Sequence, residues 1–315
     1  MRVLVTGVAG FVGPYLVRAL QAGGHEVHGS MLPGEDRGAL QGLGVVLHDA
    51  DVADGPGLRR LLAETEPGGV IHLAAVSFVP TAADDPQLAY RVNVGGTVAL
   101  LGAMRATVRE ARLLFVGSSD AYGAVRPEEL PVGEEVPLRP LSVYGATKAA
   151  AEIAVAQWGR TEGLDVVMAR PFNHTGPGQS ADFVCPALAR QIVAIEKGTQ
   201  EPVLRVGNVD PVRDIGDVRD VVRAYIALLE GGASGAVYNV CSGEGASIAE
   251  VIAQLRTHAR VPMRAYSDPA RRRAVEIPRI VGSHARITAD TGWRPEIPLS
   301  QTLCDVLDDW RRRDA

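Results

Sequence analysis

Short apolar runs alternate with longer, helix-length segments along the first 172 residues of the chain. The runs are rich in Val and Leu, which is typical of strands buried on both faces of a parallel sheet. Residues 10–24, 55–69 and 86–110 instead show apolar side chains at helical spacing. The alternation predicts a doubly wound α/β fold, with strands at residues 2–6, 25–30, 44–48, 70–75, 111–117 and 165–171.

The alternation becomes irregular after Phe172, where Pro and Gly cluster in residues 171–179 and 206–214. A chain of 315 residues is long enough for one large domain and a smaller lobe. We predict a main α/β domain over 1–172, to which residues 210–243 return with a last strand at 236–243. The smaller lobe then comprises residues 173–209 and 244–315.

Charge and cysteine content narrow the possible partners. The net charge of −5 argues against an electrostatic nucleic-acid binder, so a small molecule is the expected partner. The cysteines are Cys185, Cys241 and Cys304, too far apart for a zinc module or a disulfide framework, and we expect no metal site. The sequence predicts neither export nor membrane insertion, which favours the cytoplasm.

Three glycines follow the first predicted strand directly and open the next helix. Gly7, Gly10 and Gly13 form the pattern GxxGxxG, and Pro14 suits the first helical turn. Glycines at this junction let the backbone turn tightly and approach a pyrophosphate on the helix N-terminus. Loops also use glycine merely to turn, but this placement predicts dinucleotide binding.

The end of the second predicted strand bears on which dinucleotide binds. Enzymes that use NAD usually carry an acid there, whereas Ser30 occupies this place and Arg37 follows. The missing carboxylate favours NADPH over NADH, unless the loop brings Asp36 to the ribose. Asp51 and Val52, after the third strand, are similar to a pair that contacts adenine in related folds, but they could equally cap a helix.

Tyr144 precedes Lys148 by four residues, which places both on one face of a helix. A nearby ammonium stabilises phenolate and is expected to lower the pKa of the tyrosine, making it a usable acid or base. Proton transfer coupled to hydride transfer then needs no metal. A buried tyrosine beside a snorkelling lysine is the alternative, and the upstream glycine motif argues against it.

These motifs together resemble a known family. Residues 7–13, 72–75, 93–97, 118–123 and 144–148 are similar to the extended short-chain dehydrogenase/reductase family of nucleotide-sugar enzymes, whose dinucleotide-binding fold is the Rossmann fold. Further segments resemble the reductases of GDP-4-keto-6-deoxymannose (GDP-6-deoxy-D-mannose reductases) and, less closely, GDP-mannose 4,6-dehydratases. They are residues 170–179, 183–198, 204–220, 237–243 and 271–283.

The resemblance implies roles for individual residues. Ser118 would hydrogen-bond the sugar carbonyl, Tyr144 would donate the proton, and Lys148 would bind the nicotinamide ribose. Asn93 would lie near the cofactor or cap the backbone, and His72 is expected to be a packed strand residue. The expected cofactor-binding residues are Gly7, Gly10, Phe11, Val12, Gly13, Ser30, Asp51, Val52, Leu73, Ala74, Ala75, Asn93, Tyr144, Lys148 and Pro171.

A second set is expected to hold the GDP-linked sugar. Arginines there would bind phosphate or ribose, although each could equally be a solvated surface residue. The family contact at Arg273 and Glu276 lacks its usual proline here. The set comprises Ser119, Asn173, His174, Val184, Arg190, Arg205, Arg213, Arg273 and Glu276.

Reductase and dehydratase differ in the groups that they need. A dehydratase requires an extra acid/base, typically a glutamate, where this chain has the shorter Asp120. Residues 173–184 also follow the reductase pattern. The sequence therefore favours reduction of the C4 ketone to GDP-6-deoxymannose (GDP-rhamnose), with the C4 epimer left open. A dehydratase that uses Asp120 as acid/base and a non-catalytic nucleotide sensor remain alternatives.

The family resemblance also implies a homodimer. Relatives pair the helix around residues 86–109 and the one after Tyr144 into a four-helix interface. The alanine-rich residues 145–158 suit close helix packing, but they would also suit an interior helix.

Overall fold

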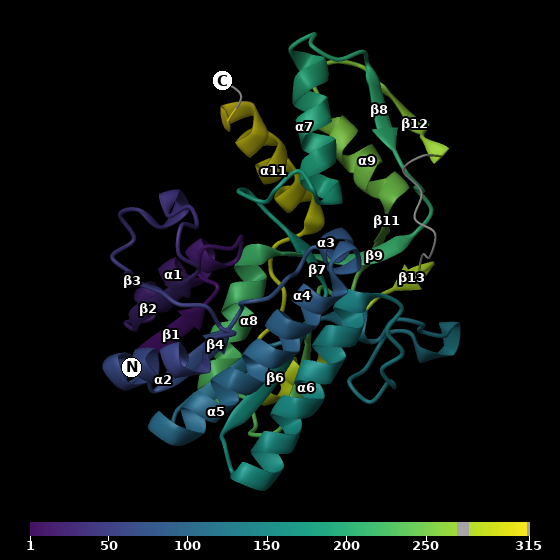
Figure 1. The fold of residues 1–315 in the computed structure, drawn as a ribbon. Helices are drawn as coiled ribbons and strands as arrows, with labels where there is room; N and C mark the ends of the chain where they lie inside the picture. Colours follow the sequence, from purple (N-terminus) through teal and green to yellow (C-terminus); the bar gives the residue numbers. More distant parts are fainter. Residues whose placement is uncertain (270–276, 314–315) are drawn as a thin grey trace.

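The computed structural model describes residues 1–269 and 277–313. Within them, seven parallel strands form one sheet in the order β10-β6-β5-β4-β1-β2-β3 (Figure 1). This confirms the predicted doubly wound fold. The strands are β1 Arg2–Thr6, β2 Glu26–Met31, β3 Val46–Asp49, β4 Gly69–His72, β5 Arg112–Val116, β6 Val166–Pro171 and β10 Val237–Val240.

Helices cover both faces of this sheet, and the strands other than the edge strand β3 bury side chains on both sides. One core joins the sheet to α1 and α8 and includes Leu16, Val17 and Tyr225. The opposite core joins it to α2, α5 and α6 and includes Leu58 and Leu100. These helices are α1 Gly13–Ala22, α2 Gly55–Thr65, α5 Thr97–Thr107, α6 Val143–Glu162 and α8 Val218–Gly231.

A smaller lobe lies beyond the carboxyl edge of the sheet (Figure 1). Strand β9 Val212–Asp217 pairs with β7 Asn173–Thr175, β11 Gly245–Ser247 and β13 Arg279–Ile280. Strands β8 Val203–Val206 and β12 Arg264–Ser267 form a separate pair. The remaining core lies among α7 Val184–Glu196, α9 Ile248–Thr257 and α11 Leu299–Arg313.

The segment 210–243 divides between the two parts. Strand β9 lies in the small sheet, whereas α8 packs on the large sheet and β10 pairs with β6. The return to the large sheet therefore begins near Val218, later than predicted, because the backbone of β9 pairs with β7.

Short helical elements complete the chain. They are η1 Gly38–Leu40, α3 Val79–Asp84, α4 Pro86–Tyr90, the π-helical turn Arg91–Gly96, η3 Ser119–Ala121, η4 Pro127–Glu129 and α10 Ala285–Thr291. Among the described residues, no helix is both long and apolar enough to cross a membrane.

Candidate active site

The glycine loop between β1 and α1 is packed tightly on one side and open on the other. Gly7 has φ +68°, and a Cβ built on it would lie 2.7 Å from Cα of Ala74. On Gly13, a Cβ would lie 1.8 Å from the Val8 carbonyl oxygen. On Gly10, by contrast, the nearest described atom would be the Gly7 oxygen at 3.4 Å. This open face at a helix N-terminus suits a diphosphate.

An aromatic contact joins the glycine loop to the smaller lobe. The ring of Phe11 stacks on His174 of β7, with centroids 6.3 Å apart and planes at 13°. The His174 Nδ1–H donates to the Phe172 carbonyl at 2.9 Å. Burial lowers the pKa of His174, although that hydrogen bond and the charge of Asp217 oppose the shift.

Val12 directly precedes α1 and serves as its N-cap position.

Ser30 lies inside β2 and not at the exposed end of that strand. It is 1% exposed, and its hydroxyl has no hydrogen-bond partner among the described residues. The strand continues to Met31, which is also buried, so Leu32 is the first exposed residue at this edge. The structure therefore places Ser30 in the core, contrary to the prediction that it contacts the cofactor.

The loop after β2 presents a cation. The Arg37 Nη2 donates to the Asp49 carboxylate at the end of β3, over 2.7 Å, and both side chains are about half exposed. The acid considered as an alternative ribose ligand, Asp36, accepts a hydrogen bond from the Gly38 amide at 2.8 Å. One of its carboxylate oxygens thus accepts a hydrogen bond from the loop's own backbone.

The remaining predicted cofactor contacts follow strand ends along the same edge. Asp51 accepts a hydrogen bond from the Ala53 amide at 2.8 Å, as a backbone cap does. Val52 is buried, and a Cβ on Gly96 would lie 2.8 Å from its side chain. Residues next to or within the ends of β4 and β6 complete the set: Leu73, Ala74, Ala75 and Pro171.

Helix α6 carries the predicted proton donor in its first turn. Ser142 caps the helix, so Tyr144 and Lys148 lie one turn apart. The Lys148 ammonium is buried and donates to the Val116 carbonyl at 2.8 Å. Val116 ends β5, and Ser118, two residues later, lies within hydrogen-bonding reach of the Tyr144 phenol. The structure thus brings the three predicted catalytic residues together.

The ionisation of Tyr144 differs from the prediction. Burial raises the pKa of its phenol, the charge of Asp120 raises it further, and the hydrogen bond with Ser118 opposes both. Burial lowers the pKa of Lys148 to about 8. The expected lowering of the Tyr144 pKa by Lys148 is not seen, and that ammonium donates to the Val116 carbonyl instead. The phenol is therefore protonated at neutral pH, as a proton donor must be before reduction.

Asn93 forms hydrogen bonds both to the loop that follows β4 and to helix α6. Its Oδ1 accepts from the Val76 amide at 2.8 Å, and its Nδ2 donates to the Val76 carbonyl at 3.2 Å. The same Nδ2 donates to the Thr147 hydroxyl at 2.9 Å. Thr147 in turn donates to the Tyr144 carbonyl at 2.8 Å. Asn93 is thus placed to orient α6 through the backbone of Tyr144.

His72 is a packed strand residue, as expected. Its Nδ1 lies 2.7 Å from the Thr6 hydroxyl and its Nε2 lies 3.1 Å from the Thr97 hydroxyl. The Thr97 hydroxyl donates to the Asn93 carbonyl, so the Nε2–H of His72 must donate to Thr97. Burial lowers the pKa of His72 to about 3, which keeps the ring neutral.

The predicted sugar-nucleotide residues lie on several elements. Ser119, in η3, is buried, whereas Asn173 is exposed in β7. Val184 and Arg190 are exposed on α7. Two further residues, Arg273 and Glu276, fall outside the described residues.

Two of the predicted arginines, Arg205 and Arg213, already have contacts within the smaller lobe. Arg205, in β8, lies over the ring of Tyr266 at 6.0 Å and has its Nη2 4.0 Å from Glu201. The Arg213 Nη1 donates to the Val212 carbonyl at 2.9 Å. Their guanidinium groups are half-exposed or exposed, so a ligand phosphate can still approach them.

Sequence reasoning missed an aromatic contact between the two parts of the chain. Phe78, before α3, meets Phe183, before α7, edge to face with centroids 5.8 Å apart. Phe183 remains 38% exposed beside Val184. The apolar pair "FV" at 183–184 was the available signal, and it was a weak one because singly exposed apolar residues are common.

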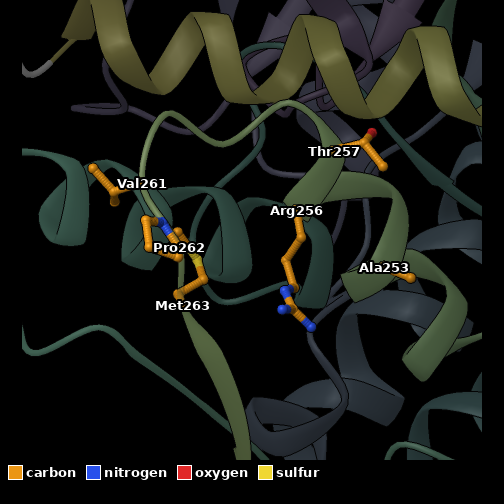
Figure 2. Close-up of a pocket in the computed structure, with 6 residues that line it drawn as sticks. All are labelled: Ala253, Arg256, Thr257, Val261, Pro262 and Met263. Carbon is orange, nitrogen blue, oxygen red and sulfur yellow. The ribbon is translucent and has the colours of Figure 1, made fainter.

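A hollow of about 270 Å³ lies away from these residues, at the end of α9 (Figure 2). Figure 2 shows Arg256 beside Pro262 and Met263, with Thr257 and Ala253 along the helix. Its described lining holds one ionisable side chain and none of the motif residues. The described residues also contain no cluster that could hold a metal ion.

The fold and the site define a nucleotide-dependent enzyme of the short-chain dehydrogenase/reductase class. A family model described as GDP-mannose 4,6 dehydratase matches residues 4–306. The GDP-6-deoxy-D-mannose reductase of Pseudomonas aeruginosa is 43% identical over 312 residues, covering 99% of this chain and 98% of that protein. The chain belongs to the GDP-mannose 4,6-dehydratase family within the extended short-chain dehydrogenases/reductases.

Other relatives mark the breadth of this similarity. A structure of RMD from Pseudomonas aeruginosa complexed with NADPH matches with a TM-score of 0.88 and 41% identity, covering 99% of both chains. The structure of a UDP-glucose 4-epimerase of Thermus thermophilus in complex with NAD matches with a TM-score of 0.87 and 32% identity, again covering 99% of both chains. A GDP-mannose 4,6-dehydratase of Vibrio cholerae is 26% identical, over 97% of this chain and 92% of that protein.

Proposed function

We propose that this enzyme reduces the C4 ketone of GDP-4-keto-6-deoxy-D-mannose, with NADPH or NADH, to GDP-6-deoxy-D-mannose (GDP-D-rhamnose). The observation that carries the proposal is geometric: the Tyr144 phenol, in the first turn of α6, shares a hydrogen bond with Ser118 at the carboxyl edge of the sheet. The full-length similarity to a GDP-6-deoxy-D-mannose reductase supports this substrate.

Each residue of the site has a separate role in the proposed reduction. Bound at the glycine loop, the reduced nicotinamide cofactor supplies hydride to the carbonyl carbon. The Ser118 hydroxyl donates a hydrogen bond to the carbonyl oxygen and polarises it. Tyr144 gives its phenolic proton to the same oxygen as negative charge develops there. Lys148, held at the Val116 carbonyl, binds the ribose.

Two incubations test this proposal. In one, the protein receives GDP-4-keto-6-deoxymannose with NADPH or NADH; in the other, it receives GDP-mannose alone. The proposal predicts cofactor oxidation in the first tube and an unchanged sugar in the second. A 4-keto sugar formed from GDP-mannose would make the protein a dehydratase, and inertness in both tubes would favour a nucleotide sensor.

Dehydration is the second candidate, since the charge of Asp120 acts on Tyr144 and the matching family model is described as a dehydratase. A dehydratase needs Asp120 as acid/base and would lose activity in Asp120→Asn. Reduction needs no such group. Asp120→Asn should therefore keep its reductive turnover, although removal of the charge lowers the Tyr144 pKa.

The cofactor preference belongs to the same proposal. We infer that Arg37, whose guanidinium donates to Asp49 and remains half exposed, binds a 2′-phosphate, since β2 ends without a carboxylate. We therefore favour NADPH. Arg37→Ala should raise KM for NADPH about tenfold and leave KM for NADH within twofold. Equal changes for both cofactors would remove the basis for this preference.

Assembly and location complete the proposal. Tyr90, Val98 and Ile153 are apolar and exposed on α4, α5 and α6, which fits a second copy of this chain packed there (Figure 1). We therefore propose a homodimer. The free thiols of the three cysteines suit a reducing cytoplasm.

A further inference from the structure

A buried ion pair joins the catalytic helix to strand β6. The Arg170 Nε donates to Glu152 Oε2 at 2.9 Å, and Nη2 donates to Oε1 at 2.6 Å. Both side chains are at most 7% exposed. Glu152 follows Lys148 by four residues, so both project from one face of α6. Replacing such a pair by apolar residues often leaves stability unchanged, so stability alone does not explain it.

The same guanidinium also holds the turn that carries Ser118. The Arg170 Nη1 donates to the Tyr122 hydroxyl at 2.8 Å, and the guanidinium lies 4.7 Å from the centre of that ring. Tyr122 directly follows η3 and donates to Asn239 Oδ1 of β10 at 2.7 Å. Asn239 in turn donates to the Val132 carbonyl at 2.8 Å.

The carboxylate of Glu152 contacts the end of β5 as well. A Cβ built on Gly117 would lie 3.4 Å from Glu152 Oε2 and 2.9 Å from the Ala169 oxygen. Gly117 separates Val116, which accepts the Lys148 hydrogen bond, from Ser118. Helix α6 is therefore hydrogen-bonded to the end of β5 through Lys148 and lies close to it again at Glu152, one turn later.

We propose that Arg170 is a positioning residue for proton transfer. It binds the helix of Tyr144 through Glu152 and the turn of Ser118 through Tyr122, and so sets the separation between Ser118 and Tyr144. This role rests on the proposed reduction. Reacting groups misplaced by about 1 Å can lose on the order of a hundredfold in rate, so a small shift is sufficient to matter.

Arg170→Lys tests the proposal because it keeps a charge beside Glu152 but cannot bind both Glu152 oxygens and Tyr122 together. We expect kcat to fall at least tenfold, while KM for the keto sugar and the Kd of NADPH stay within twofold. The solvent deuterium isotope effect on kcat should rise, because proton transfer becomes slower relative to the other steps. Tyr122→Phe, which keeps the ring, should change kcat and the isotope effect in the same direction.

Arg311→Lys is the matched control. Arg311 forms a similar two-bond pair with Glu196, at 3.0 and 2.7 Å, in the smaller lobe. Loss of this two-bond pair should lower the free energy of unfolding without changing the solvent isotope effect on kcat. If Arg170→Lys and Tyr122→Phe resemble this control, Arg170 is only structural and the proposal is overturned.

Hydrogen exchange separates this inference from the proposed activity. In Arg170→Lys, amide exchange should accelerate in residues 117–122 and 143–152, and in Arg311→Lys it should not. That comparison needs no turnover. If the protein without substitutions is inactive, the reductase proposal is refuted. If Arg170→Lys leaves the exchange rates of both segments as they were, the positioning role is refuted.

Discussion

The phenol of Tyr144 experiences opposing influences from its neighbours. Burial and the charge of Asp120 keep it protonated, and the Ser118 hydrogen bond favours ionisation. The buried Lys148 ammonium, one helical turn away, donates to the Val116 carbonyl and is not among these influences. The site therefore starts in the protonated state that reduction requires.

Replacing Tyr144 by Phe should remove this proton while keeping the ring. We expect turnover of the keto sugar to fall by about 10²- to 10⁴-fold, as is typical for loss of a general acid. The Kd of NADPH, measured by fluorescence titration, should change less than twofold. Tyr90→Phe is the control, since Tyr90 is exposed on α4 and should keep full turnover. Normal turnover in Tyr144→Phe would refute the assigned donor.

Lys148 should give the ligand-free protein a distinct pH dependence. Its pKa falls from 10.5 to about 8 on folding because it is buried. Between those values the unfolded chain binds more protons than the folded one, so the free energy of unfolding rises with pH across this window. Below pH 8 both states are charged, and the full desolvation penalty reduces stability.

Lys148→Met lacks this titration. The free energy of unfolding, measured with urea, should rise by about 2 kcal/mol more in the unsubstituted protein than in the variant between pH 7.5 and pH 9.5. Parallel pH dependences in the two proteins would show that Lys148 keeps an ordinary pKa.

Single residues also show what the sequence could not predict. The helical spacing of Tyr144 and Lys148 is local and was sufficient to place both on α6. Ser30 was predicted at the end of the second strand, but β2 runs one residue further, to Met31. Successive side chains of a strand point to opposite faces, so this one-residue difference changed the face assigned to Ser30. The pairing of Arg170 with Glu152 depends on how α6 lies against β6, although the position of Glu152 one turn after Lys148 was a usable signal.

At the scale of elements, the junction of β1 and α1 separates structural from functional glycines. Gly13→Ala should prevent folding, because its Cβ would lie 1.8 Å from the Val8 oxygen. Gly10→Ala should fold with an unchanged Tm but bind NADPH at least tenfold more weakly, because the new methyl group enters the space open to the diphosphate. Thermal unfolding and cofactor titration measure both effects. Unchanged NADPH affinity in Gly10→Ala would contradict the assigned cofactor position.

The strands of the large sheet were predictable, and those of the small lobe were not. Buried parallel strands have continuous Val-rich runs, and all seven runs lie in the large sheet. Strands such as β7 and β13 span only three and two residues, with no periodicity to detect. Their pairing with β9 joins segments distant in sequence, which local patterns cannot reveal.

At the scale of the whole molecule, the exposed apolar face of α5 and α6 should determine assembly. Ile153 is 62% exposed there, and Val98 is 39% exposed. Ile153→Glu would bury a charge in the proposed dimer and should give a monomer by light scattering. Val46→Glu is the control, since Val46 is 48% exposed on the edge strand β3 and should leave the dimer intact. A monomeric unchanged protein would refute the dimer.

Isotopic labelling of the transferred hydride tests the central claim most directly. The protein is incubated with GDP-4-keto-6-deoxymannose and NADPH that carries deuterium at the transferred position of the nicotinamide, and the sugar product is examined by NMR. The account predicts GDP-6-deoxymannose with one deuterium at C4 in the unchanged protein and almost no product with Tyr144→Phe. Deuterium found elsewhere in the sugar, or equal product formation by the two proteins, would contradict it.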